Sequence, residues 1–169
     1  MSKELCKELG ISEDLLLARG FVAYPEARVL AIAEINADAR RFELEPDAAA
    51  AWKQMKADAA AAGIELWLMS AYRSVTYQAN LIRTKLKRGL SLEQILAVNA
   101  PPGYSEHHTG RAIDINSLEI DFEHSRAYQW LSGHAQRFDF HLSYPRNNPL
   151  GYQFEPWHWC YGTTLLAVN

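Results

Sequence analysis

The sequence has little cysteine, no long hydrophobic run and no excess of charge of either sign. Its two cysteines, Cys6 and Cys160, lie near opposite ends of the chain, so the sequence does not indicate a disulfide framework like those of small secreted domains. The 17 basic and 20 acidic side chains give a net charge of −3. This balance lacks the basic footprint that binds a phosphate backbone, so no nucleic-acid partner is expected. The chain also has no glycine-rich phosphate loop, internal repeat or low-complexity linker.

Hydrophobic segments long enough for targeting or membrane insertion are missing as well. The longest apolar run near the N-terminus, residues 15–18, is too short for the core of a signal peptide. No stretch reaches the length that crosses a bilayer, so no membrane span is expected. The expected location is the cytoplasm, the alternative being an exported protein whose signal has been removed.

The sequence does contain the composition of one ordinary globular domain. Its 169 residues are 49% hydrophobic and 22% charged, which fits a single folded unit over 1–169. Residues 1–62 are expected to supply N-terminal helices, and residues 63–162 carry the motifs described below. All six histidines lie in the C-terminal half, and this skew is the most informative feature of the composition.

Periodicity and turn residues divide the chain into helices followed by strands. Helices are expected over 26–41, 47–62, 77–88 and 124–137, with a short one after Ser91, and strands over 64–69, 111–116, 138–144 and 157–161. The run Asn-Ala-Pro-Pro-Gly at 99–103 predicts a loop. Because helices come first and strands later, with a helix between them, the pattern favours an α+β domain over a doubly wound sheet.

A histidine and an aspartate in the second half of the chain are spaced so that they can meet. His107 and Asp114 are seven residues apart, and a turn at Gly110 would bring the two side chains together. On the strand expected there, Ala112 shares a face with Asp114 and leaves room for an ion. His158, from the last expected strand, would supply a third ligand. Two imidazoles and one carboxylate suit zinc and leave a fourth position open to water, as in catalytic sites.

Glu155 stands three residues before His158 and has a use at such a site. A carboxylate close to the metal, but not bound to it, can take a proton from water as that water attacks a carbonyl. Zinc lowers the pKa of a bound water to about 7, so hydroxide becomes available at neutral pH. Pro156 predicts a bend between Glu155 and His158 rather than the interior of a strand.

The other histidines and Cys160 have simpler interpretations. Packed or solvated histidines are more common than ligands, and we keep that interpretation for His124, His134 and His141. His108 directly follows His107, and adjacent strand residues face opposite ways, so only one of the two is expected to reach a metal. Cys160 shares a strand face with His158, but joint ligation of one ion would be strained, so Cys160 is expected to be a small buried filler.

Arg73 and Gln78 lie upstream, just after an expected strand. The common role of such an arginine is a surface salt bridge of little consequence. The functional alternative is a guanidinium that grips a carboxylate or steadies a developing oxyanion. Gln78, five residues further on, could add an amide hydrogen bond.

Three segments together resemble the motifs of a metallopeptidase family. The run SEHHTGRAID at 105–114 resembles the Ser-x-His-x-x-Gly-x-Ala-x-Asp motif of the VanY-type zinc D-alanyl-D-alanine carboxypeptidases, which share a superfamily with VanX dipeptidases and certain phage endolysins. The run FEPWHW at 154–159 is similar to that family's Glu-x-Trp-His segment. The run SAYRSVTYQ at 70–78 is similar to its Tyr-Arg-Ser…Gln segment. Order and approximate spacing agree from about Leu66 to Gly162, more than half of the chain.

The resemblance implies a cofactor and a base. His107, Asp114 and His158 would bind Zn²⁺, and Glu155 would be the catalytic base. The implied fold is a single α+β domain whose small antiparallel sheet bears the zinc site and packs against N-terminal and intervening helices.

The resemblance also implies a substrate and its contacts. Arg73 would help bind the substrate and stabilise the tetrahedral intermediate, and Gln78 and Ser105 would be further substrate contacts. The family acts on peptidoglycan stem peptides, in muropeptides or wall precursors, and removes a terminal D-alanine. Many members carry arginines at the positions of Cys160 and Ser143, so this chain is expected to differ in substrate preference.

Three functions remain open at the level of sequence. The first is a zinc carboxypeptidase acting on D,D- or L,D-bonds, with L,D favoured in the cytoplasm because a D,D-enzyme there would destroy wall precursors. The second is a peptidoglycan endopeptidase of the lysin kind. The third is a zinc-stabilised binding module without catalysis, which would want a fourth protein ligand and would have no use for Glu155.

Overall fold

The structure is a computed structural model that describes residues 1–148 and 152–162. The remainder of the expected 1–169 domain, residues 149–151 and 163–169, lies outside the described residues. The α-helices are α1 (Ser2–Glu8), α2 (Glu13–Ala18), α3 (Pro46–Ala61), α4 (Val75–Lys87), α5 (Leu92–Leu96) and α6 (Arg126–His134). The 3-10 helices are η1 (Glu106–Thr109), η2 (Ile120–His124) and η3 (Ala135–Phe138). The strands are β1 (Ala31–Ile35), β2 (Arg41–Leu44), β3 (Leu68–Ser70), β4 (Ala112–Ile115), β5 (Phe140–Leu142) and β6 (His158–Tyr161).

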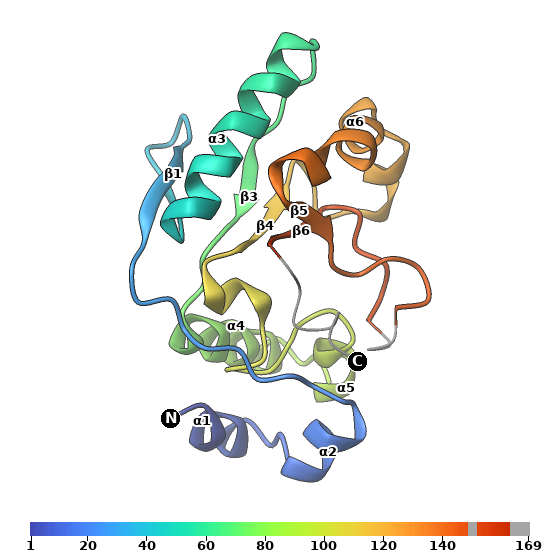
Figure 1. The fold of residues 1–169 in the computed structure, drawn as a ribbon. Coiled ribbons are helices and arrows are strands. Elements are labelled where there is room, and N and C mark those ends of the chain that lie inside the picture. Colours follow the sequence, from blue (N-terminus) through green and yellow to red (C-terminus); the bar gives the residue numbers. More distant parts are fainter. Residues whose placement is uncertain (149–151, 163–169) are drawn as a thin grey trace.

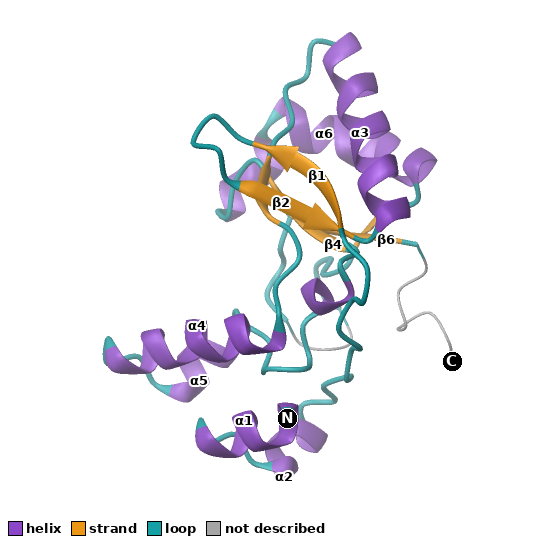
Figure 2. Cartoon of the chain, turned by 90° about the vertical axis from the view of Figure 1, so that its left-hand side faces the viewer, coloured by secondary structure: helices purple, strands orange, loops and turns teal. Residues whose placement is uncertain are grey.

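These elements form two lobes (Figure 1). The mixed lobe holds the strands together with α3 and α6, and the helical lobe holds α1, α2, α4 and α5. Figure 2, turned by 90°, shows the same division, with the β1–β2 hairpin in the mixed lobe and loops passing between the lobes. Within the described residues, none of the helices combines the length and the apolar character that a membrane crossing requires.

Four short strands form one antiparallel sheet in the order β3-β4-β6-β5. β6 comes last along the described chain, yet it lies between β4 and β5. β1 and β2 pair with each other as a separate antiparallel hairpin. The predicted α+β class with a small antiparallel sheet is therefore confirmed.

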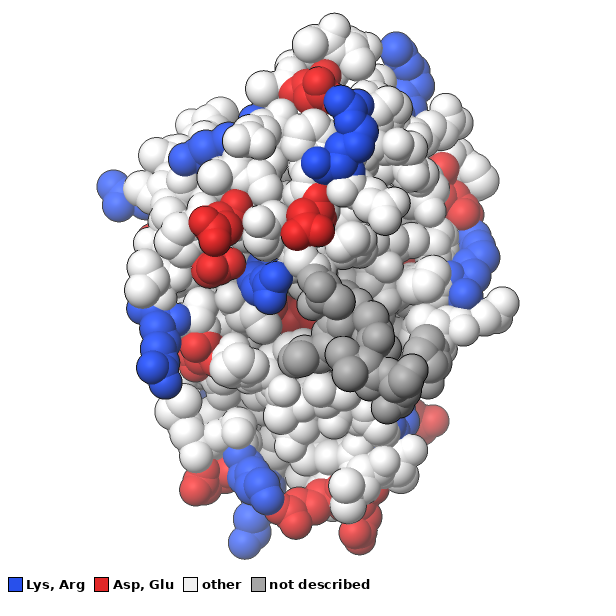
Figure 3. Space-filling view, viewed as in Figure 1, with Lys and Arg blue, Asp and Glu red and all other residues white. Residues whose placement is uncertain are grey.

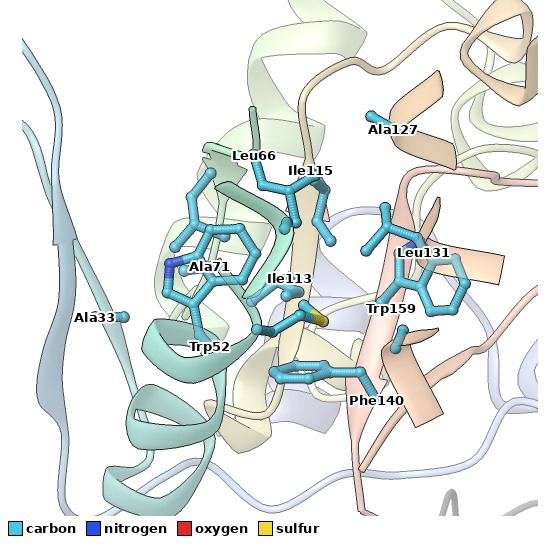
Figure 4. Close-up of a cluster of buried hydrophobic side chains, with 14 of the residues drawn as sticks. Ala33, Trp52, Leu66, Ala71, Ile113, Ile115, Ala127, Leu131, Phe140 and Trp159 are labelled. Atoms are coloured by element: carbon cyan, nitrogen blue, oxygen red, sulfur yellow. The ribbon is translucent and has the colours of Figure 1, made fainter. Parts of the chain in front are cut away.

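The core of the mixed lobe covers one face of this sheet (Figure 4). Trp52 from α3, Ile113 from β4 and Phe140 from β5 belong to one apolar cluster and are fully buried. Because successive strand residues face opposite ways, Ile113 and Ile115 point into this core while Asp114 points to the other face. The carboxylate of Asp114 thus lies on the face of β4 that points away from this apolar core, although the strand is buried on both faces.

A second apolar cluster holds the helical lobe together. It consists of residues from all four helices of that lobe and the turn after α1: Cys6, Leu9, Ile11, Leu16, Ala79, Ile82, Ile95 and Leu96. The side chains of Ser12, Ser74 and Ser91 accept hydrogen bonds from backbone N–H groups in the first turns of α2, α4 and α5. At α5 the bond is reciprocated by the side chain of Gln94, which completes a capping box, and the short helix expected after Ser91 is confirmed.

The helix predicted over residues 26–41 is wrong, because this stretch contributes to the β1–β2 hairpin. Alanine, glutamate and arginine favoured a helix in isolation, but the turn residues outweigh them. The side-chain oxygen of Asn36 accepts from the N–H groups of Asp38 (3.1 Å) and Arg40 (2.9 Å), and Ala39 adopts a φ of 59°. The N-terminal 62 residues are therefore helices plus a hairpin rather than helices alone.

The strand predicted over 64–69 is shorter than expected, because only Leu68–Ser70 enters the sheet. Ile64, Leu66 and Leu68 are buried alternately, as predicted. The backbone between them instead bonds to a side chain: Asn116 accepts from the N–H of Trp67 (2.9 Å) and donates to a carbonyl nearby (2.8 Å). Residues 64–67 therefore show alternating burial although they precede the paired strand β3.

The remaining elements largely follow the sequence predictions. The helices expected at 47–62 and 77–88 are α3 and α4, and the loop at 99–103 is confirmed. The helix expected over 124–137 is interrupted: α6 ends at His134 and continues as η3. The strands expected at 111–116, 138–144 and 157–161 form shorter strands at these places.

A connector of residues 21–30 joins the lobes and runs along the loop that ends in η1. Its backbone N–H groups bond to that loop, from Tyr24 to the carbonyl of Gly103 (2.9 Å) and from Ala27 to the carbonyl of His108 (2.7 Å). Just after η1, Gly110 has a φ of +69°, and a Cβ there would lie 2.9 Å from the backbone nitrogen of Glu45. The turn at Gly110 therefore requires both a left-handed backbone and the absence of a side chain.

Gly110→Ala is expected to lower the free energy of unfolding more than Gly89→Ala does. Gly89 also has a positive φ, +86°, but a Cβ there meets nothing within 4 Å. The left-handed backbone costs both variants about 1–2 kcal/mol, and crowding should cost Gly110→Ala about 1–3 kcal/mol more. Urea unfolding of the two variants measures the difference, and equal losses would show that the close approach at Gly110 is unimportant.

Candidate metal centre

The pairing of β4 with β6 places Asp114 directly opposite His158. Residues opposite each other in an antiparallel pair share a face, so the two side chains meet on the face of the sheet that points away from the apolar core. Nδ1 of His158 lies 3.0 Å from Oδ1 of Asp114. Both residues are buried, with 3% and 5% of their surface exposed.

His107 reaches the same point from η1. The turn at Gly110 brings its Nε2 to 3.3 Å from Oδ2 of Asp114, and its ring meets that of His158 edge-on with 4.8 Å between centroids. One potential ligand atom from each of the three residues can be chosen so that all lie within 4.8 Å of one another. The structure thus brings together the three residues that the sequence predicts as ligands, while their binding of zinc stays a prediction.

The hydrogen bonds of His107 fit a metal ligand. Its Nδ1 lies 2.7 Å from the carbonyl oxygen of Ala71, which can only accept, so Nδ1 carries the proton and donates. Nε2 is then left with a lone pair, is buried, and has no hydrogen-bond partner among the described residues. A buried acceptor without a partner costs free energy, and a cation at the centre would satisfy it. The donor set of two imidazoles and one carboxylate fits zinc.

Burial and the neighbouring charges shift the pKa values of the three residues in different directions. Burial, assisted by the charge of Arg73, lowers the pKa of His107 to about 4. Burial would raise the pKa of Asp114, but the neighbouring His107 and His158 outweigh this and hold it well below the usual range. Burial would lower the pKa of His158, yet hydrogen bonds with Asp114 and Glu106 raise it to about 10. His107 is therefore neutral near pH 7. His158, without metal, carries a second proton and is positively charged.

Glu155 lies beside this cluster, at the start of the turn that leads into β6. The N–H of His158 donates to the carbonyl of Glu155 (3.1 Å), so the bend predicted at Pro156 is confirmed. Oε2 of Glu155 is 3.9 Å from Nδ1 of His158, close to the centre but not part of the three-residue group. Burial raises the pKa of Glu155 to about 7. A base of this pKa can both accept and release a proton near neutral pH.

Arg73, in the turn between β3 and α4, faces the same centre. Its Nη2 is 3.7 Å from Oδ2 of Asp114, and its Nη1 donates to Oε1 of Gln78 (3.5 Å). Gln78 in turn donates to the carbonyl of Ala100 (2.8 Å), which fixes the amide. Nε of Arg73 is buried and has no partner among the described residues. The guanidinium is thus held at one end and retains a free donor.

Two adjoining cavities open at the centre. A larger one of about 540 Å³ is lined by Arg73 and Glu155 on the metal side, and by Lys85, Glu119 and Asp121 further out. Figure 3 shows the face seen in Figure 1, where acidic and basic side chains are interspersed rather than gathered in one patch of a single sign.

A smaller inner cavity of about 40 Å³ lies between the ligands and the helical lobe. Ser105, Gln78 and Tyr144 line it, together with His107 and His158, the two histidines predicted as ligands. The predicted substrate contacts Ser105 and Gln78 therefore line the inner cavity, and Arg73 lines both.

The other histidines and Cys160 lie outside the three-residue group, as predicted. His108 accepts from the N–H of Gly103 (3.0 Å) and its Nδ1 lies 2.6 Å from the carbonyl oxygen of Arg73, so it ties the loop to the β3–α4 turn. Cys160 is buried. The rest are solvated or packed: His124 is exposed, His141 is partly exposed, and His134 stacks on Trp130.

The sequence model of the VanY family, described as D-alanyl-D-alanine carboxypeptidase, matches residues 41–164. The chain belongs to this family. The match covers β2, both cavities' metal side and all three predicted ligands, and it leaves α1, α2, β1 and the connector outside.

Individual VanY-type relatives agree with this assignment. A D-alanyl-D-alanine carboxypeptidase of Enterococcus faecalis is 34% identical over 115 residues, which is 62% of this chain and 43% of that protein. The chain spans between 33% and 44% of the length of three curated relatives.

Solved structures are also similar. The LdcB LD-carboxypeptidase superposes with a TM-score of 0.73 at 28% identity, covering 82% of this chain and 72% of that one. The VanY D,D-pentapeptidase, solved in complex with Zn(II), superposes with a TM-score of 0.64 at 25% identity, covering 83% of each chain.

Two positions where VanY-type members often carry arginine hold Ser143 and Cys160 here. Both are buried, and neither lines either of the two cavities. The cationic side chains that line the larger cavity are Arg73 and Lys85.

Sequence reasoning missed one buried carboxylate of the VanY motif. Glu106, between Ser105 and His107, is 1% exposed, and its Oε2 lies 3.0 Å from Nε2 of His158. Glutamate is almost never fully buried unless it is paired, and a sequence does not show the partner. Its position between two motif residues was the only sign available.

Zinc binding by this VanY-type centre is expected to strengthen as pH rises. Without metal, His158 has a pKa of about 10 and therefore carries a second proton at lower pH. A ring nitrogen must release its proton before it can bind a metal. Glu155, with a pKa of about 7, has already lost its proton above about pH 8 and adds nothing there. One released proton predicts about a tenfold rise in the apparent zinc association constant per pH unit between about pH 8 and pH 9.

Competition with a chelator of known pH dependence measures this slope, and calorimetry in two buffers counts the protons released. His124→Ala, which replaces an exposed histidine, is a matched control that should leave the slope unchanged. A zinc affinity independent of pH over this range would show that His158 is neutral without metal.

Proposed function

We propose that this protein is a zinc-dependent carboxypeptidase that removes the terminal D-alanine from peptidoglycan stem peptides. The observation that carries the proposal is the buried group of His107, Asp114 and His158 with Glu155 beside it at the edge of a cavity. The similar proteins are named D-alanyl-D-alanine carboxypeptidase and LD-carboxypeptidase, which supports the substrate class.

His107, Asp114 and His158 would hold the zinc ion. When bound there, zinc polarises the scissile carbonyl and makes water a stronger acid and nucleophile. Glu155 takes the proton of the attacking water at its carboxylate and passes it to the departing amine, which leaves as the amino group of D-alanine. Its pKa of about 7 suits both transfers.

Arg73 supplies positive charge where negative charge develops. Arg73 lines both cavities, so its guanidinium is placed to face the oxyanion. Gln78 and Asp114 contact its two terminal nitrogens and thus fix its direction. Donors that are already oriented need no reorganisation during the reaction.

The inner cavity supports a small terminal residue. Its volume of about 40 Å³ exceeds the roughly 10–15 Å³ of cavity that one water needs, so it has room for a small group such as a methyl side chain. Ser105 and Gln78 add polar groups to its lining, which suits a terminal carboxylate. The larger cavity would take the rest of the peptide, with Lys85 facing its acidic groups and Glu119 and Asp121 its amino groups.

The two other functions left open by the sequence fit less well. An endopeptidase must hold peptide on both sides of the bond, but the space on the inner side is about 40 Å³ against 540 Å³ on the outer side. A zinc-stabilised module would want a fourth protein ligand, whereas three residues form the metal-binding group among those described. Glu155 is then available as a base.

Of the two bonds, we propose the L,D bond. The choice rests on the cytoplasmic location proposed from the sequence, because a D,D-enzyme there would destroy wall precursors. The solved L,D-carboxypeptidases LdcB and DacB superpose with TM-scores of 0.73 and 0.58, on either side of the 0.64 of the D,D-pentapeptidase, so the fold is compatible with either bond.

The test is to incubate the zinc-loaded protein with tripeptide, tetrapeptide and pentapeptide muropeptides and to identify the products by mass. Loss of one alanine from the tetrapeptide is the expected result. Loss of one alanine from the pentapeptide alone would replace the L,D by the D,D bond and keep the carboxypeptidase. Internal cleavage would indicate an endopeptidase, and no turnover with zinc bound would indicate the binding module.

A further inference from the structure

Glu106 is a carboxylate deep inside the protein, on η1 directly before His107. It is 1% exposed, although an unpaired buried carboxylate costs several kcal/mol. It belongs neither to the predicted metal ligands nor to the lining of either cavity. Its position must therefore be explained by the groups that it touches.

Those groups are one side of His158 and one tyrosine. Oε2 of Glu106 lies 3.0 Å from Nε2 of His158, and Oε1 accepts a hydrogen bond from the hydroxyl of Tyr24 at 3.4 Å. The other nitrogen of His158, Nδ1, faces Asp114 and the centre. Glu106 thus binds His158 on the side away from the metal site.

Each of the two histidines predicted as ligands faces the centre with one ring nitrogen and an acceptor with the other, but the two rings use opposite nitrogens. His107 donates from Nδ1 to the carbonyl oxygen of Ala71 and turns Nε2 to the centre. His158 faces the centre with Nδ1 and contacts an acceptor with Nε2. In each case an acceptor behind the ring decides which nitrogen keeps its proton.

We propose that Glu106 is a positioning residue of the metal centre: it holds the proton of His158 on Nε2 and so keeps Nδ1 free to bind the metal. This inference rests on the zinc site of the proposed function. A carboxylate behind a ligand imidazole also makes the ring a stronger donor. Together with Asp114, Glu106 supplies two negative charges, equal in size to the charge of Zn²⁺, so the buried centre is electrically balanced.

The N-terminal connector completes this arrangement from outside the part of the chain that the family model matches. The hydroxyl of Tyr24 bonds Glu106, and the backbone N–H of Tyr24 bonds Gly103 in the same loop (2.9 Å). The N–H of Ala27 bonds the carbonyl of His108 (2.7 Å), so the connector restrains both ends of the segment that carries Glu106. Residues 21–30 thereby belong to the support of the centre although they precede the matched region.

The test measures zinc affinity by chelator competition for the full chain and for Glu106→Ala and Glu106→Gln. Removing a carboxylate behind a metal ligand costs about 10–100-fold in metal affinity, which is the loss expected for Glu106→Ala. Glu106→Gln is expected to recover most of this loss, because its amide oxygen can accept from Nε2 while its amide nitrogen donates to the hydroxyl of Tyr24.

Two further measurements separate positioning from a general loss of stability. The ¹⁵N shifts of the His158 ring report its tautomer, and the proton is expected on Nε2 in the zinc-loaded full chain and in Glu106→Gln. Glu34→Ala is the matched control: Glu34, on β1, is another paired carboxylate whose side chain is only 8% exposed, and it bonds Trp52 and Lys56 and does not touch the centre. This variant is expected to lose stability but keep the zinc affinity of the full chain.

The outcomes are distinguishable from those of the proposed function. If the full chain binds no zinc, the zinc site itself fails. If the full chain binds zinc and Glu106→Ala binds it equally well, or if the proton of His158 lies on Nδ1, the role of Glu106 is overturned. Should Glu106→Ala not fold, Glu106→Gln and the tautomer of His158 in the full chain still decide the question.

Discussion

Glu155→Gln is expected to keep its zinc and to lose turnover by about 10²–10⁴-fold, the contribution of a positioned general base. Glutamine has nearly the same shape as glutamate but cannot take a proton from water. Glu155 lies 3.9 Å from Nδ1 of His158 and outside the three-residue group, so its replacement removes no predicted ligand. The loss should therefore fall on kcat, with little change in zinc content.

The measurement combines zinc content by mass spectrometry with kcat and KM on the muropeptide that the full chain cleaves. Glu93→Gln, an exposed glutamate on α5, makes the same chemical change away from the centre and should leave both unchanged. If Glu155→Gln retains activity, the proton is taken by another group. If it loses zinc as well, Glu155 is a ligand and the centre has four protein groups.

His107→Ala is expected to abolish stoichiometric zinc binding and to reduce turnover by about 10³-fold or more. A catalytic zinc contributes several kcal/mol to transition-state stabilisation, and each 1.36 kcal/mol corresponds to tenfold in rate. Nε2 of His107 is buried and has no hydrogen-bond partner among the described residues. No described protein group therefore takes the place of a metal ion at this nitrogen. The variant removes a ligand without leaving an unpaired charge.

Zinc content and turnover are measured for His107→Ala beside His124→Ala, whose side chain is 77% exposed. The control should bind one zinc ion and turn over at the rate of the full chain. Circular dichroism of both variants shows whether the fold is kept. Full activity of His107→Ala after zinc removal would contradict metal-assisted hydrolysis at this centre.

Local chemistry explains which parts of the fold could be predicted. Ser74 and Ser91 cap the helices that follow them, and such bonds lie within three residues of one another, so a sequence displays them. The same holds for the turn at Gly110, which joins His107 to Asp114 over seven residues. The meeting of these two side chains was predictable for this reason.

Long-range contacts explain the rest. The β1–β2 hairpin turns locally at Asn36, and Glu34 then bonds Trp52 and Lys56 on α3, a contact that the composition of residues 26–41 does not reveal. Glu106 could not be assigned because its partner, His158, lies 52 residues further along the chain. His158 was proposed as the third ligand from its place on the last expected strand, and the resemblance of its motif implied the same role.

The place of β6 in the sheet sets the order in which the protein can be completed during synthesis. A nascent chain emerging from the ribosome presents β3, β4 and β5 first, and β6, the last strand of the described chain, must then insert between β4 and β5. Until it does, both neighbours have open edges of the kind that favours misassociation. The same insertion delivers His158 opposite Asp114. Closure of the sheet and assembly of the proposed metal site therefore coincide, and a chain that stalls before β6 can complete neither of them.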